Sequence, residues 1–217
     1  ATDSWTTKAD MPTARSGMGL AAANGRIYAI GGYDGTRLAT VEVYDPVTDS
    51  WTSGTDMPTP RSTFGLAAAD GTIYAIGGQT NSGEVGTVEA YDPVADSWTT
   101  RTSMPTARSA LGVAVASDGN IYAVGGGSNL QTVEAYDPAA NAWATRADMP
   151  TGRDALGLAA GINGRLYAIG GTSTQGGLPE ALKVVEVYEP ATDTWTTETS
   201  LPADREYPGA VGTTGGK

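Results

Sequence analysis

Five tryptophans divide the chain into units of nearly constant length. They are separated by 46, 47, 45 and 52 residues, and each is followed seven residues later by a proline. Three residues beyond each proline stands an arginine, and four of the five units continue with a Gly-Gly pair and a Val-Glu-x-Tyr-(Asp/Glu)-Pro segment. The tryptophans are Trp5, Trp51, Trp98, Trp143 and Trp195. Self-similarity at a period of this size indicates a tandem-repeat architecture.

Each unit carries the sequence signals of four short β-strands. Residues 19–23 and 27–30 are joined by Asn24-Gly25, a pair that suits a two-residue type I′ hairpin turn because both residues there need positive φ. The same turn is predicted at Asp70-Gly71, Asp118-Gly119 and Asn163-Gly164. Residues 41–44 alternate with period two, and a fourth strand opens at residue 50. We label these strands a, b, c and d. No segment keeps helical periodicity over about ten residues, so a helix content close to nil is expected.

Four antiparallel strands in each unit are typical of a β-propeller blade. The glycine doublet that ends strand b, with a Tyr in strand c and a Trp in strand d, resembles the kelch repeat over essentially the whole chain. The resemblance implies an all-β propeller of the kelch type. The repeats themselves give four complete four-stranded blades, so residues 1–217 are expected to form a single kelch-type propeller or a fragment of one. Complete repeats are expected at about 15–55, 61–102, 108–147 and 153–199. We expect the Trp and Tyr rings to pack between blades, with Trp51, Trp98 and Trp143 largely buried, and the glycine doublets to allow close backbone packing.

The array also predicts an incomplete fifth blade. A d strand, residues 4–8, precedes the first complete repeat, and an a strand within residues 206–212 follows the last one. Open edge strands promote aggregation, so we expect these edges to be covered. Another chain, a continuation of the same polypeptide, or direct pairing of the d and a strands would do so. The resemblance implies six or seven blades in the parent protein.

Charge and composition exclude several functional classes. The chain has 13 Lys and Arg against 24 Asp and Glu, a net charge of −11, which argues against nucleic-acid and membrane partners. It has no Cys and no His, which excludes disulfides, thiolate or imidazole metal sites and Ser-His-Asp catalysis. No metal or other cofactor is predicted. The sequence does not identify a compartment, and extracellular or periplasmic placement is favoured over cytoplasmic.

The units differ mainly in the loops between strands b and c. From the second glycine of each doublet to the first Val of strand c the distances are 9, 10, 7 and 14 residues. In an up-and-down blade the b–c and d–a loops emerge on the same face. Variable loops on a rigid scaffold usually carry binding specificity. A binding face is therefore expected where residues 33–40, 79–87, 127–132 and 172–184 meet the d–a loops.

The repeated arginines belong to the d–a loops of this face. A ring of guanidinium groups suits a carboxylate or a phosphate, so all five are candidate ligand residues. In kelch domains that recruit acidic peptides, arginines at matching positions contact the ligand, as the resemblance implies. The favoured alternative is that each arginine pairs with Glu42, Glu89, Glu134 or Glu186, because residues repeated in every blade usually serve the repeat. The arginines are Arg15, Arg61, Arg108, Arg153 and Arg205.

These features favour a non-catalytic interaction scaffold that binds a protein, peptide or glycan through the loop face. One alternative is a carbohydrate-acting isomerase that resembles the sialic-acid mutarotases built on kelch-type propellers. Asp154 and Glu206 are its candidate residues, because they replace the small residue that follows the arginine elsewhere. Another alternative is a structural protein whose open blade edges mediate assembly, by self-association or through the continuation of the chain.

Overall fold

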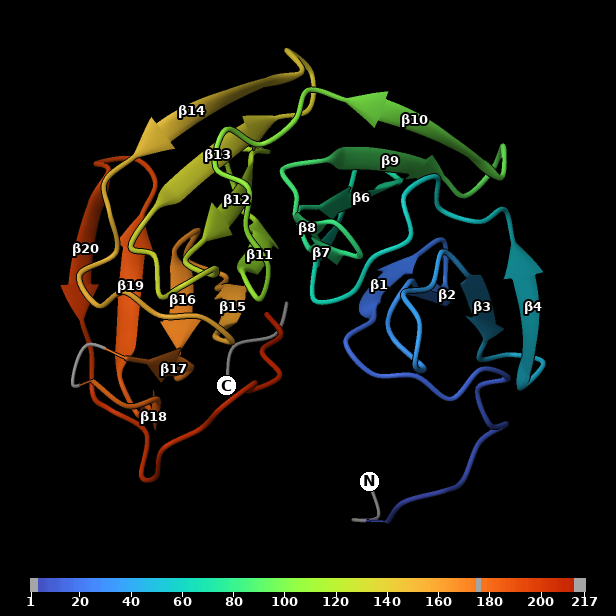
Figure 1. The fold of residues 1–217 in the computed structure, drawn as a ribbon, viewed down its shortest axis with the longest axis horizontal. Coiled ribbons are helices and arrows are strands. Elements are labelled where there is room, and N and C mark those ends of the chain that lie inside the picture. The colour runs from blue at the N-terminus through green and yellow to red at the C-terminus, as the bar shows by residue number, and fades with distance from the viewer. Residues whose placement is uncertain (1–3, 175–176, 213–217) are drawn as a thin grey trace.

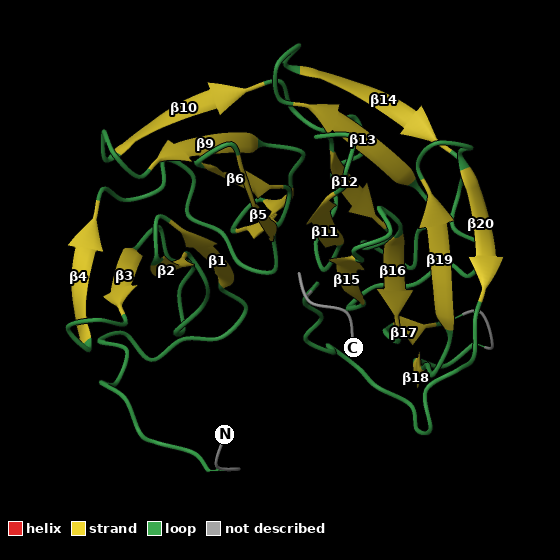
Figure 2. Ribbon diagram, turned by 180° about the vertical axis from the view of Figure 1, so that it is seen from behind, coloured by secondary structure: helices red, strands yellow, loops and turns green. Residues whose placement is uncertain are grey.

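Four antiparallel sheets lie side by side around a common axis in the computed structural model, which describes residues 4–174 and 177–212 (Figure 1). Each sheet has four strands, whose spatial order follows the chain from the innermost strand outward. Seen from behind, the sheets form an arc that is open on one side (Figure 2). Each sheet is one blade of a propeller, which confirms the predicted all-β, four-bladed architecture. The described residues contain no α-helix, and hence none that could cross a membrane.

The strand bounds repeat closely from blade to blade. Blade 1 contains β1 (Gly19–Ala23), β2 (Arg26–Ile30), β3 (Val41–Asp45) and β4 (Ser50–Gly54). Blade 2 contains β5 (Gly65–Ala69), β6 (Thr72–Ile76), β9 (Val88–Asp92) and β10 (Ser97–Arg101). Blade 3 contains β11 (Gly112–Val115), β12 (Ile121–Val124), β13 (Val133–Asp137) and β14 (Ala142–Arg146). Blade 4 contains β15 (Gly157–Ala160), β16 (Leu166–Ile169), β19 (Val185–Glu189) and β20 (Thr194–Thr197).

Two small ribbons lie in the b–c loops of blades 2 and 4. Strand β7 (Gln79–Thr80) pairs with β8 (Gly83–Glu84), and β17 (Thr172–Ser173) pairs with β18 (Glu180–Ala181). These loops are the longest of the four by sequence, and the extra residues fold back on themselves as hairpins. The loops expected to vary therefore carry additional structure.

The hairpin turns follow the predicted type in two blades and differ in the other two. Asn24 and Gly25 have φ of 51° and 74°, as a type I′ turn requires, and the equivalent pair in blade 2 behaves in the same way. In blade 3 only Gly119 of the predicted pair has positive φ. The Ala116 N–H donates to Asn120 O, so this loop holds three residues instead of two. The prediction at Asp118-Gly119 and Asn163-Gly164 is wrong because blades 3 and 4 each have one extra residue at this turn.

The hydrophobic core lies between consecutive blades. Tyr28 and Ile30 of β2 pack with Ile73 of β6 and Tyr91 of β9, and equivalent buried clusters join blade 2 to blade 3 and blade 3 to blade 4. At each interface a Tyr of strand b packs against a Tyr of strand c in the next blade. The ring pairs are Tyr28–Tyr91, Tyr74–Tyr136 and Tyr122–Tyr188, with centroids 5.9, 5.9 and 5.5 Å apart. Burial of apolar surface therefore stabilises the array through contacts between neighbouring blades.

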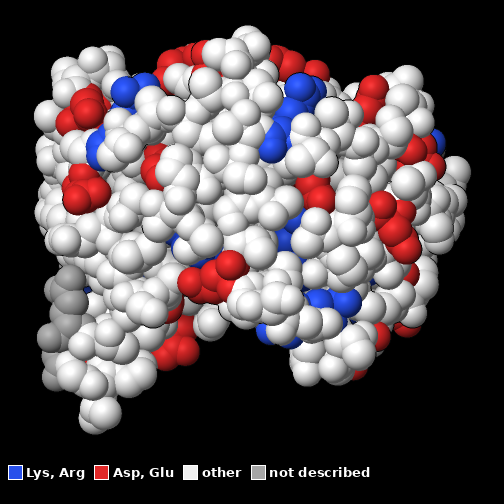
Figure 3. All heavy atoms as spheres, turned by 45° about the horizontal axis from the view of Figure 1, so that its top comes forward, with Lys and Arg blue, Asp and Glu red and all other residues white. Residues whose placement is uncertain are grey.

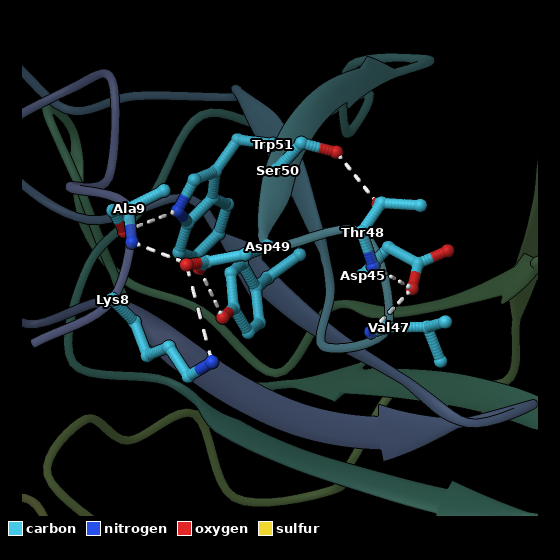
Figure 4. Close-up of polar contacts among 9 residues, drawn as sticks. Lys8, Ala9, Asp45, Val47, Thr48, Asp49, Ser50 and Trp51 are labelled. Atoms are coloured by element: carbon cyan, nitrogen blue, oxygen red, sulfur yellow. Dashed lines mark hydrogen bonds and ion pairs between the residues drawn. The ribbon is translucent and has the colours of Figure 1, made fainter. Parts of the chain in front are cut away.

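A hydrogen-bonded clamp reinforces each interface at the outer edge. Figure 4 shows it at blade 1, where the Ala9 N–H donates to Asp49 Oδ1 at 2.9 Å and Trp51 Nε1–H donates to Ala9 O at 3.0 Å. The same two bonds recur with Thr55, Thr102 and Ala147, each held by the blade that follows it. The indoles therefore contact the preceding segment of the array, as expected. Trp51, Trp98 and Trp143 are only half-buried, so the prediction of near-complete burial is wrong, because strand d is the outermost strand of its blade.

The glycine doublets lie where two blades approach most closely. Gly31 and Gly32 have φ of +62° and +106°, and a Cβ on Gly32 would lie 2.8 Å from the carbonyl oxygen of Ser16. A Cβ on Gly31 would lie 2.7 Å from the carbonyl oxygen of Arg61, in the next blade. Any side chain at these positions would displace the d–a loop. The predicted close backbone packing is confirmed.

The two terminal segments differ in detail from the expected strands. Residues 4–8 and 206–212 form no strand in the part of the chain that the structure describes. The Tyr207 N–H still donates to Ala155 O at 2.9 Å, and a Cβ on Gly157 would meet Pro208 and Ala210. Residues 207–210 therefore lie where a fifth innermost strand would begin. A strand a pairs with a strand b, and within residues 4–174 and 177–212 no strand b lies beside this segment.

Candidate functional site

Four of the five repeated arginines lie in buried sockets inside their own blades. In blade 2, Arg61 Nη1 donates to Glu89 Oε2 at 2.7 Å, Arg61 Nη2 donates to Ala75 O at 3.0 Å, and Thr59 Oγ1 donates to Glu89 Oε1. Equivalent ion pairs are Arg15–Glu42, Arg108–Glu134 and Arg153–Glu186, with N–O distances of 2.8, 3.0 and 2.7 Å. The four guanidinium side chains have no exposed surface. Burial lowers the pKa of each of these arginines, and the paired carboxylate opposes that shift.

These sockets match the alternative in which each arginine pairs with a glutamate. Arg61, Arg108 and Arg153 also join two blades, because the carbonyl oxygen of each accepts a hydrogen bond from the glycine doublet of the preceding blade. The Gly32 N–H donates to Arg61 O at 3.0 Å, and the Gly78 N–H donates to Arg108 O at 2.9 Å. A ligand on the surface cannot contact these guanidinium groups while the sockets are formed. The candidate ring of ligand-binding arginines is therefore not supported for these four residues.

Arg205, Asp154 and Glu206 occupy different surroundings. Arg205 is exposed, its Nη1 donates to Asp204 O at 2.8 Å, and no carboxylate of the described residues pairs with it. Glu206 is also exposed. Asp154 is half-buried, and burial together with the nearby charge of Glu84 raises its pKa. These three residues remain candidate ligand residues.

The d–a and b–c loops meet along their backbones, as the up-and-down topology predicts. In blades 1, 2 and 4 the residue after the arginine forms a backbone bridge with the residue after the glycine doublet. These bridges are Ser16–Tyr33, Ser62–Gln79 and Asp154–Thr172, and in blade 3 the Gly127 N–H donates to Ser109 O at 2.8 Å. The two sets of loops therefore form one continuous surface, on the opposite side of the blades from the a–b turns.

A chain of backbone hydrogen bonds runs around the axis within this surface. The second residue after each arginine has positive φ, and its N–H donates to the carbonyl oxygen of the equivalent residue in the preceding blade. The bonds join Thr63 to Gly17, Ala110 to Thr63, Ala155 to Ala110 and Tyr207 to Ala155, with lengths of 2.7, 2.8, 2.8 and 2.9 Å. Only main-chain atoms take part, so the side chains at these five positions are free to differ. We call the loop surface around this series of hydrogen bonds the channel mouth.

A pocket of about 650 Å³ opens at the channel mouth beside blades 1 and 2, and most of its exposed lining is apolar. It is lined by Ser16, Gly17, Tyr33, Arg37, Ser62, Thr63, Gln79 and Tyr207. The guanidinium carbon of Arg37 lies 5.9 Å from the centroid of the Tyr33 ring, and Arg37 Nη1 donates to Asn81 Oδ1 at 3.0 Å. The lining offers one cation, two phenols, three hydroxyls and an amide. Such a set can bind hydroxyl groups and an anion.

The predicted face includes Tyr33, Arg37 and Gln79 within its b–c loops, but the sequence did not single them out as candidate ligand residues. Tyr33 and Gln79 follow the glycine doublets, where the other two blades have Gly127 and Thr172. Tyr207 stands where the other repeats have small residues. The available signal was the difference between repeats at equivalent positions. The candidates were instead chosen mainly among residues that every repeat shares, and in four repeats the shared arginine is structural.

Comparison with known proteins agrees with this architecture. The model of the Kelch motif matches residues 14–58, 60–105, 108–150 and 158–202. The chain belongs to the kelch-repeat family. A solved structure titled "Structure of YjhT" is similar, with a TM-score of 0.83 over 97% of this chain and 78% of that one. Its sequence identity is 18%, so the likeness shows a shared kelch-type propeller fold. No curated protein matches the sequence.

Charges of both signs are interspersed on the side of the kelch propeller drawn in Figure 3. Acidic side chains are distributed over its outer surface, and basic side chains form small separate groups. This side therefore has no continuous basic patch of the kind that a nucleic-acid backbone requires.

Proposed function

We propose that this kelch propeller is a non-catalytic binding module whose ligand, a protein, peptide or glycan, contacts the channel mouth. The observation that carries the proposal is that shared residues and variable residues occupy different places within each repeat. Residues shared by all repeats, including the arginine sockets and the tryptophan clamps, are used for folding. The residues that differ, at the position after the doublet and the two positions after the arginine, face the loop surface. Binding residues placed on a rigid scaffold are the usual arrangement in such folds.

The channel mouth can be tested by comparing two paired variants. Tyr33→Ala with Gln79→Ala removes a ring and an amide from the pocket without touching a socket or a clamp. Val47→Ala with Val94→Ala is the matched control, because these side chains are 91% and 86% exposed on the c–d turns of the opposite face. Both variants and the original chain are applied to peptide and glycan arrays. The proposal requires a peptide or glycan that binds the original chain and the valine control but not the Tyr33 and Gln79 variant. Binding that is lost in the valine control and kept in the Tyr33 and Gln79 variant would contradict it.

A second candidate is sugar isomerisation, which one observation supports. Asp154 has a raised pKa and stands at the channel mouth, and interconversion of sugar anomers requires a proton donor and acceptor. Glu206 is exposed in the equivalent position of the next repeat and supplies a second carboxylate. Polarimetry of freshly dissolved sugars tests this function. It requires a rate above the spontaneous one that Asp154→Asn abolishes, whereas an unchanged rate with the intact chain excludes it.

Assembly through blade edges is a third candidate, supported by the exposure of blade 1. Ile27 is 40% exposed, whereas its counterparts Ile73, Ile121 and Leu166 are fully buried by the preceding blade. Leu20 is 56% exposed, whereas Leu158 in blade 4 is 7% exposed. Exposed apolar patches of this kind mark interaction surfaces. Light scattering across a dilution series measures self-association, which Ile27→Glu should reduce, and a monomer at every concentration excludes it.

A further inference from the structure

Arg37 carries a positive charge that the protein itself leaves uncompensated. Its Nε atom is buried and makes no hydrogen bond within the described residues. No carboxylate among them lies within ion-pair distance of its guanidinium group, in contrast to the four socket arginines. An unpaired Nε is shared with the socket arginines, so the missing ion pair and the position in the pocket wall set Arg37 apart. An arginine in that position is well suited to receive an anion through its remaining guanidinium N–H groups.

The loop that carries Arg37 holds it in place. Tyr33 forms a backbone bridge with Arg37, and the Leu38 N–H donates to Gly32 O at 2.9 Å, which closes the loop at its base. Asn81, from the b–c loop of blade 2, accepts a hydrogen bond from Nη1 at 3.0 Å. The ring of Tyr33 lies beside the guanidinium group. The guanidinium group of Arg37 is therefore held in one orientation before a ligand binds, which reduces the conformational entropy lost on binding.

The rest of the pocket combines a few hydroxyl and amide groups with a larger apolar surface. Ser16, Ser62 and Thr63 provide hydroxyls, and Gln79 provides an amide. Tyr33 and Tyr207 add phenols and ring faces on which a saturated ring can lie. None of the lining residues carries a carboxylate, and a volume of about 650 Å³ falls in the range of small-molecule sites.

We propose that this pocket binds a compact carboxylate that bears several hydroxyl groups, with Arg37 holding the carboxylate and the Ser, Thr and Gln side chains holding the hydroxyls. The proposal rests on the function proposed above and names its ligand class. An extended acidic peptide fits less well, because Asp34, Glu84 and Glu180 are exposed on the b–c loops and the chain carries a net charge of −11. A single carboxylate avoids most of that repulsion.

Three variants and one control isolate the role of Arg37. Arg37→Gln removes the charge, Arg37→Lys keeps the charge but loses the two-pronged geometry, and Asn81→Ala keeps Arg37 but removes the amide that orients it. Arg26→Gln is the matched control, because it changes the charge by the same amount beside the a–b turn of the opposite face. Thermal melting of each variant verifies that it folds. Asn81→Ala keeps the test valid even if a change at Arg37 destabilises the loop.

Calorimetric titrations use glucuronate, glucose and a short oligoglutamate peptide as probes. We expect glucuronate to bind at least about tenfold more tightly than glucose, the difference that one charge-assisted contact supplies. Arg37→Gln should remove this preference, Arg37→Lys and Asn81→Ala should reduce it, and Arg26→Gln should leave it unchanged.

Three results would overturn the proposal. The first is equal binding of glucuronate by the original chain and Arg37→Gln, and the second is no binding of glucuronate at all. The third is tighter, Arg37-dependent binding of the peptide, which would assign the pocket to acidic peptides. The binding of the Tyr33 and Gln79 variant to the peptide and glycan arrays tests the proposed function separately. A ligand that binds the channel mouth without needing Arg37 would support the proposed function and would refute only the ligand class.

Discussion

Removal of Glu89 should be among the most damaging single changes in the protein. Glu89 is 2% exposed, and its two carboxylate oxygens accept hydrogen bonds from Arg61 and Thr59. Glu89→Ala leaves the guanidinium group of Arg61 inside the blade with its main partner gone. Arg61 cannot discharge itself, because an arginine keeps its proton in proteins. A buried charge without a partner is therefore the direct consequence of the change.

The expected loss is about 3–5 kcal/mol, the range for breaking one side of a buried ion pair. For a chain of this size that corresponds to a fall in Tm of about 6–20 °C. The third blade provides an internal comparison. Its pair is less completely bonded, because Nη1 of Arg108 makes no hydrogen bond whereas Nη1 of Arg61 donates to Glu89, so Glu134→Ala should cost less than Glu89→Ala.

Urea unfolding followed by tryptophan fluorescence and circular dichroism measures both variants. A third variant, Arg61→Met with Glu89→Leu, removes both charges and should recover most of the lost stability, because the desolvation cost disappears together with the pair. A loss below about 1 kcal/mol for Glu89→Ala, or no recovery in the double variant, would falsify the assignment of the sockets as folding elements.

Other predictions address the tryptophan clamp, the loss of stability at high pH and the glycine doublets. Trp98→Phe removes the indole N–H that donates to Thr55 O and should cost about 1 kcal/mol in urea unfolding, whereas no loss would mean that the clamp is inert. The hydrogen bond to Asp49 and burial raise the pKa of Tyr44 to about 12, so the stability it contributes is complete below about pH 10 and is lost as the pH rises toward 12. An ultraviolet titration that shows Tyr44 ionising at the ordinary pKa would contradict this. Gly78→Ala places a Cβ 2.6 Å from the Cβ of Phe64 at a φ of +106° and should lower Tm, whereas Gly35→Ala, which meets open space at a φ of +119°, reports the backbone strain alone.

The repeat made the fold predictable, because the sequence signal of each strand recurs at the same position in several units. Strand order, the glycine doublets and the Arg–Glu pairing followed from residues that recur in each unit. The three-residue turns at Gly119 and Gly164 were not recognised, because Asp-Gly and Asn-Gly pairs occur in both turn lengths and one extra residue decides between them. The exposure of the tryptophans depends on their place in the outermost strand, which the local sequence does not show.

The pocket proposed as the binding site was less predictable for a physical reason. Its walls come from loops of different blades, and they meet only because the blades curve around a common axis. Arg37 and Asn81 are 44 residues apart, and no local pattern links them. The variation in loop length indicated the face on which this pocket lies, and the use of that face in binding stays a prediction. The residues on it required the three-dimensional positions of the repeats.

The series of main-chain hydrogen bonds around the axis has a consequence for how such proteins change over evolutionary time. Each link needs only a backbone N–H and a carbonyl oxygen, so the link between Ala110 and Thr63 is chemically the same as that between Ala155 and Ala110. A gene duplication that adds one whole repeat would extend the series with no compensating substitution. A duplication that adds part of a repeat would shift a strand out of its sheet. Lineages that carry this architecture are therefore free to change their blade number in whole steps while the residues at the channel mouth diverge independently.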